Sequence, residues 1–280
     1  MTTAPACPIT KLEKILLSID GTEYSEGAIR EAIKFAGKCS SKIYVIMTLA
    51  TTPEYETIGA NYFKMEAEAA KKHLETIKVQ AEKDGLTCET IFRESTSVAQ
   101  AIVEEAAAKK VDMIVIGRHG HQGIAKVLIG EVAAKVIADA PCKVLVVPKA
   151  ARIGYKKMMV ASDGSPHANT AVNEAISIAK RCGCHLIALS AIRDESELDE
   201  AKNITSTALE MAQKEGVSAE ALTPTGKPFN VVVETASGMG VDFIVMGAYG
   251  KTGIKKLLMG SSTEKVIGNA GCAVLVVKSE

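Results

Sequence analysis

Two aspartates each close a short apolar run and stand directly before a glycine. Asp20 ends the run Lys14–Asp20, and Asp163 ends the run Lys157–Asp163. A carboxylate at the end of a strand can accept hydrogen bonds from a ribose hydroxyl or from an adenine amine. An Asp-Gly pair also favours a turn, and aspartate is a good N-cap for a following helix. The pattern therefore leaves two interpretations open, a ligand contact and a helix cap.

A glycine-rich segment in the second half of the chain has the composition of a phosphate site. Gly247 and Gly250 are followed, after nine residues, by Gly260, Ser261 and Ser262. Glycines at the exit of a strand allow the backbone to approach a ligand closely. The run leads into a short predicted helix, whose free amides and positive dipole end attract anions, and the serines add hydroxyl donors. Turn glycines and a simple helix cap are the alternative, but the spacing and placement favour phosphate binding.

The first half keeps this spacing with one change of charge. Gly117, Gly120 and Gly130 stand at the same intervals, but Glu131 replaces the first serine and Val132 replaces the second. A carboxylate that faces a phosphate in a partly desolvated site costs on the order of several kcal/mol. We therefore hypothesise that Glu131 occupies its own anion site at the helix N-terminus and that the first half binds nucleotide poorly. The alternative is that basic residues of the same loop offset its charge.

The cysteines and histidines are not spaced like metal ligands. Cys182–His185 lacks the two-residue gap and the second ligand pair of a zinc site, and His119–His121 has no acidic companion. We therefore expect no metal site. Seven cysteines, an odd number without a dense framework, predict reduced thiols. Cys39 corresponds to Cys182 in the repeat, and Cys142 corresponds to Cys272, so we expect small buried residues at these positions.

An internal repeat organises the whole chain. Lys14–Gly21 recurs as Lys157–Gly164, an offset of 143 (163 minus 20). Near the end of each half the offset is 130 (272 minus 142), because Cys142–Val147 recurs as Cys272–Val277. The second copy therefore lacks 13 residues (143 minus 130) in its middle. The repeat predicts two domains, 1–150 and 151–280.

Within each half, short apolar runs alternate with stretches of helical spacing, which is typical of buried parallel strands joined by helices. The predicted strands are Lys14–Asp20, Lys42–Thr48, Thr87–Phe92, Met113–Gly117, Lys143–Val147, Lys157–Asp163, His185–Ala191, Ala219–Leu222, Phe243–Gly247 and Ala273–Val277. The predicted helices are Ser25–Lys38, Tyr62–Asp84, Val98–Lys109, Val132–Ala138, Asn169–Arg181, Ser196–Glu215, Phe229–Ser237 and Ser262–Gly268.

This alternation predicts an α/β fold of two tandem Rossmann-like domains, each a five-stranded parallel sheet with helices on both faces. Such sheets bind ligands outside the carboxyl ends of their strands, where the strand order reverses. The aspartates and the glycine segments all follow predicted strands, so we expect them to meet there. The last strand of each half is expected at a sheet edge, where an exposed edge invites pairing.

Composition excludes several classes of function. The 33 basic residues balance the 33 acidic ones, so nothing favours nucleic acid or an anionic membrane. The absence of tryptophan and an aromatic content of 4% argue against stacking on exposed rings. No apolar run reaches the ~18 residues of a membrane span, and the first ten residues do not follow the pattern of a secretory signal. We therefore expect a cytoplasmic protein.

The duplicated pattern resembles the universal stress protein family. The resemblance rests on the Gly-x2-Gly-x9-Gly-Ser spacing after the fourth strand, the aspartate that ends the first strand, and the closing Val-Leu-Val-Val strand. It covers nearly the whole chain, twice. Members that bind ATP use the glycine segment for ribose and phosphates and the aspartate for the nucleoside. The resemblance implies a cytoplasmic ATP-binding protein with a non-enzymatic role in stress response or signalling.

The resemblance also implies which positions contact the nucleotide. In the second half these are Asp163, Gly247, Gly250, Gly260, Ser261 and Ser262, with Ala191 against the adenine. In the first half the weaker counterparts are Asp20, Gly117, Gly120 and Gly130. We expect ATP with Mg²⁺ or Mn²⁺ as the bound species, and AMP as an alternative.

The same resemblance implies how the halves assemble. Val144–Val147 and Val274–Val277 are expected to pair antiparallel across a pseudo-two-fold axis, so that one chain mimics a dimer of single-domain members. A further association of two chains into a homodimer is a second expectation. Two other functions stay open, namely slow ATP hydrolysis in the same site and a nucleotide-independent role in ligand binding or as a scaffold.

Overall fold

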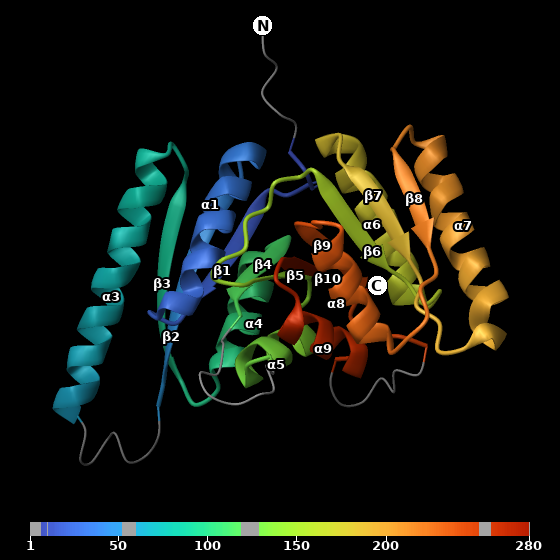
Figure 1. The fold of residues 1–280 in the computed structure, drawn as a ribbon. Coiled ribbons are helices and arrows are strands. Elements are labelled where there is room, and N and C mark those ends of the chain that lie inside the picture. The colour runs from blue at the N-terminus through green and yellow to red at the C-terminus, as the bar shows by residue number, and fades with distance from the viewer. Residues whose placement is uncertain (1–6, 10, 52–59, 119–128, 252–258, 280) are drawn as a thin grey trace, which may run out of the picture.

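The chain folds as one wide α/β structure (Figure 1). The computed structural model describes residues 7–9, 11–51, 60–118, 129–251 and 259–279. One ten-stranded sheet crosses the molecule, with helices on both faces, α3 at one end and α7 at the other. It consists of two five-stranded halves of the same topology, which confirms the predicted fold class.

The elements alternate as the spacing predicts. The strands are β1 (Lys14–Ile19), β2 (Lys42–Ala50), β3 (Cys88–Ser95), β4 (Met113–Gly117), β5 (Lys143–Val147), β6 (Lys157–Ala161), β7 (His185–Leu189), β8 (Ala219–Leu222), β9 (Phe243–Gly247) and β10 (Ala273–Val277). The α-helices are α1 (Glu26–Cys39), α3 (Ala60–Lys83), α4 (Val98–Lys109), α5 (Glu131–Asp139), α6 (Pro166–Cys182), α7 (Leu198–Lys214), α8 (Pro228–Gly238) and α9 (Ser261–Asn269).

The strand order creates one reversal in each half. The sheet runs β3-β2-β1-β4-β5-β10-β9-β6-β7-β8, so β1 lies between β2 and β4, and β6 lies between β7 and β9. All pairs are parallel except one. The chain first builds the sheet outward from β1 or β6 and then returns to its other side. The carboxyl ends of β1 and β4, and of β6 and β9, are therefore the switch points.

The exception is the seam between the halves. β5 and β10 pair antiparallel, with Leu275 opposite Leu145 and Val274 opposite Val146. This register confirms the predicted pairing of the last strands. It also closes two edges that would otherwise expose unpaired backbone groups.

Two apolar cores, one on each face of the sheet, extend across this seam. Alternate side chains of a strand point to opposite faces, so Leu145 and Leu275 enter one core and their valine neighbours enter the other. Each core contains buried residues of both halves, such as Phe35 and Phe243 on one face. The two halves therefore share their cores.

Several element boundaries near the second switch point differ from the predicted ones: β6 ends at Ala161 instead of Asp163, and α9 begins at Ser261 instead of Ser262. β7 ends at Leu189, and Ala191 lies just beyond it instead of within it. α6 begins at Pro166 instead of Asn169, because proline is tolerated in the first turn of a helix. Ser165 is the N-cap, and its hydroxyl accepts the amide of Ala168 at 3.3 Å.

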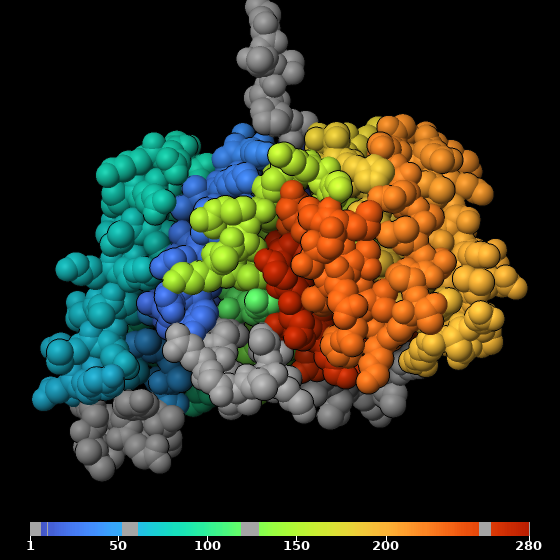
Figure 2. Space-filling view, in the orientation of Figure 1, coloured from blue at the N-terminus to red at the C-terminus, as the bar shows by residue number. Residues whose placement is uncertain are grey.

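The linker between the halves lies on α1 (Figure 2, yellow-green against blue). Arg30 donates to the carbonyls of Lys149 at 3.0 Å and Ala151 at 2.5 Å, and Lys34 donates to that of Ile153. A Cβ on Gly27 would lie 2.3 Å from the carbonyl oxygen of Pro148, so only glycine allows this approach.

One expectation about the cysteines is wrong. Cys7 and Cys39 form a disulfide that attaches the N-terminal segment to the end of α1, whereas the odd cysteine count predicted reduced thiols throughout. The remaining five cysteines are free; of those expected to be small buried residues, Cys272 is buried, whereas Cys142 and Cys182 are only half-buried. Burial raises the pKa of the Cys182 thiol to about 11 and that of Cys184 to about 12.

Candidate functional site

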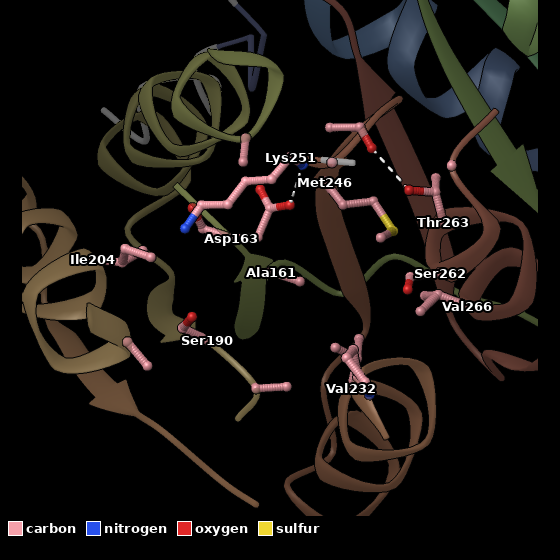
Figure 3. A pocket seen from close by; sticks show the side chains of 18 of the residues that line it. Ala161, Asp163, Ser190, Ile204, Val232, Met246, Lys251, Ser262, Thr263 and Val266 are labelled. Atoms are coloured by element: carbon pink, nitrogen blue, oxygen red, sulfur yellow. Dashed lines mark hydrogen bonds between the residues drawn. The ribbon is translucent and has the colours of Figure 1, made fainter. Parts of the chain in front are cut away.

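A cavity of about 550 Å³ opens at the second switch point, beyond the carboxyl ends of β6, β7 and β9 (Figure 3). It is lined by each of the seven residues predicted to contact a ligand in this half. These are Asp163, Ala191, Gly247, Gly250, Gly260, Ser261 and Ser262. The fold thus gathers residues that are up to 99 positions apart (262 minus 163) around one space. Their roles as ligand contacts stay a prediction.

Asp163 anchors the glycine segment to the end of β6. One carboxylate oxygen accepts the amide of Ser165 at 3.0 Å, and the other accepts the amide of Lys251 at 2.9 Å. A Cβ on Gly250 would lie 2.5 Å from Asp163 Oδ2, so the second contact requires glycine there. The bond to Ser165 is the turn that the sequence left open as one of two interpretations, whereas the bond to Lys251 was not predicted.

Gly247 has a packing role that the sequence did not indicate. A Cβ there would lie 2.8 Å from the backbone carbon of His167, so the glycine allows α6 to pack closely on the end of β9. The hydroxyl of Thr263 donates to the Gly247 carbonyl at 3.0 Å. Thr263 lines the cavity but was not among the predicted site residues, although it follows Ser262 directly.

The N-terminus of α9 presents donors to the cavity. Gly260 is the N-cap and has no side chain to satisfy the first amides of the helix. The amide of Glu264 donates to Gly260 O at 3.0 Å. Within the part of the chain that the structure describes, the amides of Ser261, Ser262 and Thr263 have no acceptor. Both serines are exposed. Free amides with the positive end of the dipole constitute an anion-binding arrangement.

The opposite wall brings charged groups that the sequence analysis missed. Glu200 pairs with Lys251, and Glu197 accepts the amide of Arg193 at 2.8 Å. With Asp163 included, the described lining carries three carboxylates and two cations. The charge balance of the cavity therefore does not itself attract a polyanion.

Apolar side chains cover the remaining surface. Val232, Met246 and Val266 line one side of the cavity, and Ile204 lines the side formed by α7 (Figure 3). An apolar lining beside a few polar groups suits a flat heterocycle joined to a polar tail.

The first half has a smaller cavity, of about 320 Å³, at its own switch point. Asp20, Gly117, Gly130 and Glu131 line it, whereas Gly120 lies outside the described residues. Asp20 Oδ1 accepts the amide of Thr22 at 2.9 Å and a hydroxyl from each of Thr22 and Ser25. In this half too, the carboxylate stabilises the turn.

Glu131 does not occupy the anion site that we expected it to fill. Its side chain is 81% exposed and pairs with Lys135 at 2.7 Å, one turn along α5. The Lys135 ammonium holds the pKa of this carboxyl below its ordinary value. Because the Glu131 carboxylate is exposed and pairs with Lys135 instead of lying at the N-terminus of α5, the self-capping part of the hypothesis is wrong. The missing hydroxyl at Val132 remains a difference from the second half.

A buried hydroxyl distinguishes the first cavity further. Among the described residues the buried Thr48 Oγ1 has no hydrogen-bond partner, and Thr48 lines the cavity. Thr48 corresponds to Ala191 in the repeat (48 plus 143), so the second cavity carries a methyl group in its place. The two cavities therefore differ in size, in charge and in polarity.

Two further features were predicted from the sequence, the spacing of possible metal ligands and the length of apolar segments. Across the described ranges, no three histidine, cysteine, aspartate or glutamate side chains gather as a metal site would require. The pair His119 and His121 lies outside those ranges. In the same described part of the chain, no helix combines the length and the apolar character needed to cross a membrane.

Comparisons with known proteins agree with the duplicated architecture. The model of the universal stress protein family matches residues 11–148 and 154–278. A universal stress protein of Methanocaldococcus jannaschii is 36% identical over 140 residues, which cover 44% of this chain and 82% of that protein. One of Mycolicibacterium smegmatis is 26% identical over 94% of this chain and 96% of its own length. The crystal structure of one from Archaeoglobus fulgidus is similar with a TM-score of 0.77 at 21% identity, over 96% of this chain and 99% of that one.

Proposed function

The chain belongs to the universal stress protein family, in two copies, and from that premise we propose that its second half binds an adenine nucleotide. The observation that carries the proposal is the first turn of α9, where the amides of Ser261, Ser262 and Thr263 have no acceptor among the described residues and border the cavity that contains Asp163. Phosphates would bind at this helix end. Adenine would lie against Ala191 and the apolar side chains.

The charges around the cavity favour ATP with a divalent cation over free ATP. Three carboxylates and two cations belong to its described lining, so a free triphosphate meets net repulsion from these residues. Mg²⁺ or Mn²⁺ bound to the phosphates removes two negative charges from the ligand. The cation would arrive with the nucleotide, since the described residues hold no metal cluster of their own. AMP, with fewer charges, would depend less on the cation.

We propose that the first half contributes little to nucleotide binding. Its cavity is smaller, and Glu131 and Val132 stand in place of the two serines. An exposed carboxylate at the start of α5 still opposes a phosphate through space, even though it pairs with Lys135. One nucleotide per chain is therefore expected. We propose a role in stress response or signalling through this occupancy; the domain limits, the cytoplasmic location and the homodimer stay predictions.

Isothermal titration with MgATP, together with thermal unfolding, tests the proposal. A bound ligand stabilises the native state by RT ln(1 + [L]/Kd), about 2.7 kcal/mol at a hundredfold excess over Kd. Wild type should bind one MgATP, and EDTA should weaken the binding. Ser261→Glu should weaken it at least about tenfold by placing a carboxylate at the helix start. Glu131 holds the equivalent place in α5, so a well-folded variant is expected.

The reciprocal variant is the matched control. Glu131→Ser combined with Val132→Ser gives the first half both hydroxyls, and the stoichiometry should rise from one towards two. No binding of ATP, ADP or AMP by wild type, with either cation, would contradict the proposed function. Two equal tight sites in wild type would contradict the assignment to the second half.

A further inference from the structure

Two cations cross the seam between the halves and bind the far ends of the helices that begin at the cavities. Arg118, which follows β4 of the first half, donates to the carbonyls of Ile267 at 3.0 Å and Ala270 at 2.5 Å, at the C-terminus of α9. Lys278, which follows β10 of the second half, donates to the carbonyls of Ala138 at 2.7 Å and Ala140 at 2.8 Å, at the C-terminus of α5.

The repeat does not explain this arrangement, because the two cations are not equivalent residues. Arg118 corresponds to Ala248, and Lys278 corresponds to Pro148, each by the offset of 130. Neither Ala248 nor Pro148 has a side chain that can donate. α9 therefore receives its cation from the first half of the chain, and α5 receives its cation from the second half.

Arg118 is firmly held where it stands. Its amide donates to the carbonyl of Val147 at 3.2 Å, and the guanidinium is partly buried, so that burial lowers its pKa. Gly117, the preceding residue, lines the cavity of the first half. Two consecutive residues thus connect the wall of the first cavity, lined by Gly117, with the C-terminal end of α9, which Arg118 contacts.

The opposite end of α9 is the proposed phosphate site. α9 contains nine residues, so its two ends lie about 14 Å apart at ~1.5 Å per residue. Two donated bonds at the last turn fix the direction of so short a helix, and a cation there complements its dipole. The orientation of the amides of Ser261 and Ser262 therefore depends on a residue of the other half.

We propose that Arg118 of the first half is a positioning residue for the nucleotide site of the second half. It acts through α9, whose first turn would hold the phosphates, and it touches no nucleotide itself. The first half thereby sets the nucleotide affinity of the second. This inference rests on the proposed function, because it concerns the same site.

The test compares ligands with and without phosphates. Binding of MgATP and of adenosine to the full chain is measured by calorimetry for wild type, Arg118→Met and Arg118→Lys. Arg118→Met should weaken MgATP binding about tenfold and adenosine binding less than about twofold, since only phosphates meet the helix end. Arg118→Lys, which keeps the charge, should restore most of the affinity for MgATP.

Lys278→Met is the matched control, because it removes a cation from the equivalent place on α5. It should lower the thermal stability of the protein, as Arg118→Met does, but leave MgATP affinity within about twofold of wild type. Unchanged MgATP binding by Arg118→Met would overturn the inference alone. An equal loss of ATP and adenosine affinity would also overturn it, since that result indicates general damage. Wild type that binds no ATP would overturn the proposed function, and the inference with it.

Discussion

Gly27 and Gly37 both lie in the helix α1, but replacement by alanine should lower the free energy of unfolding at Gly27 and raise it at Gly37. At Gly27 a Cβ would lie 2.3 Å from the Pro148 oxygen and 3.1 Å from Lys149 Cα, both backbone atoms of the linker. At Gly37 its nearest neighbour would be Leu86 Cδ2 at 4.0 Å, an ordinary contact. Alanine is favoured over glycine inside a helix by about 1 kcal/mol.

The expected magnitudes follow from these distances. Overpacking against atoms that cannot give way costs about 1–3 kcal/mol, and the linker is held in place by bonds from Arg30 and Lys34. Gly27→Ala should therefore lower the free energy of unfolding by about 2 kcal/mol, because the first turn of a helix gains little from alanine. Gly37→Ala should raise it by about 0.5–1 kcal/mol.

Urea unfolding with linear extrapolation measures both values. The cores shared by the two halves justify a single cooperative transition as the first description. Hydrogen exchange adds a local readout, because the Ala151 amide donates to Pro148 O at 3.0 Å and should exchange faster in Gly27→Ala. A neutral or stabilising Gly27→Ala, with unchanged exchange at Ala151, would show that the linker does not lie against α1.

Three further predictions concern other parts of the molecule. The Cys7–Cys39 disulfide joins residues 32 positions apart, and the loop-entropy model gives it a stabilisation of about 3.7 kcal/mol. Reduction should therefore lower the Tm of wild type, whereas the Tm of Cys39→Ser should not change with reductant. Thr48→Val should stabilise the protein by about 1 kcal/mol in urea unfolding, because it removes a buried hydroxyl without a partner; a destabilised variant would indicate a hidden partner. Gly250→Ala should displace the Asp163 carboxylate from the Lys251 amide, at about 1.5–3 kcal/mol, and reduce MgATP affinity in calorimetry; wild-type affinity would argue against the loop anchor.

Buried regular structure was predictable from the sequence because it repeats a pattern. β4, β5, β9 and β10 have the predicted bounds, since both faces of the sheet are covered and the apolar runs end where the strands end. The half-buried edge strand β8 also has the predicted bounds. β7 ends at Leu189, before its apolar run does, because the regular ladder stops there, although Ala191 and Ile192 are still apolar and Ile192 forms an isolated bridge with Thr225. Hydrophobicity alone does not mark that departure.

The composition of the candidate site was also predictable, but the contacts inside it were not. The motif spacing together with the family resemblance identified seven of the residues that gather around the second cavity. The bond from Lys251 to Asp163 joins residues 88 positions apart, and the sequence shows both residues without showing their contact. Glu131 had two partners in reach, the helix dipole and Lys135 four residues later, and the ion pair prevails. The disulfide depends on where the N-terminal segment crosses the end of α1, which no local pattern encodes.

Covalent fusion of the two copies has a consequence for how the protein can evolve. When two identical chains meet across a two-fold axis, any mutation appears on both sides, so every contact is duplicated. The β5–β10 seam has the form of such an axis, but each side of it is encoded separately. One half can therefore carry arginine where the other carries alanine, or lysine where the other carries proline, at equivalent positions that a homodimer would keep identical. A single gene thus encodes an unsymmetrical pair, in which a substitution in one half leaves the other half unchanged.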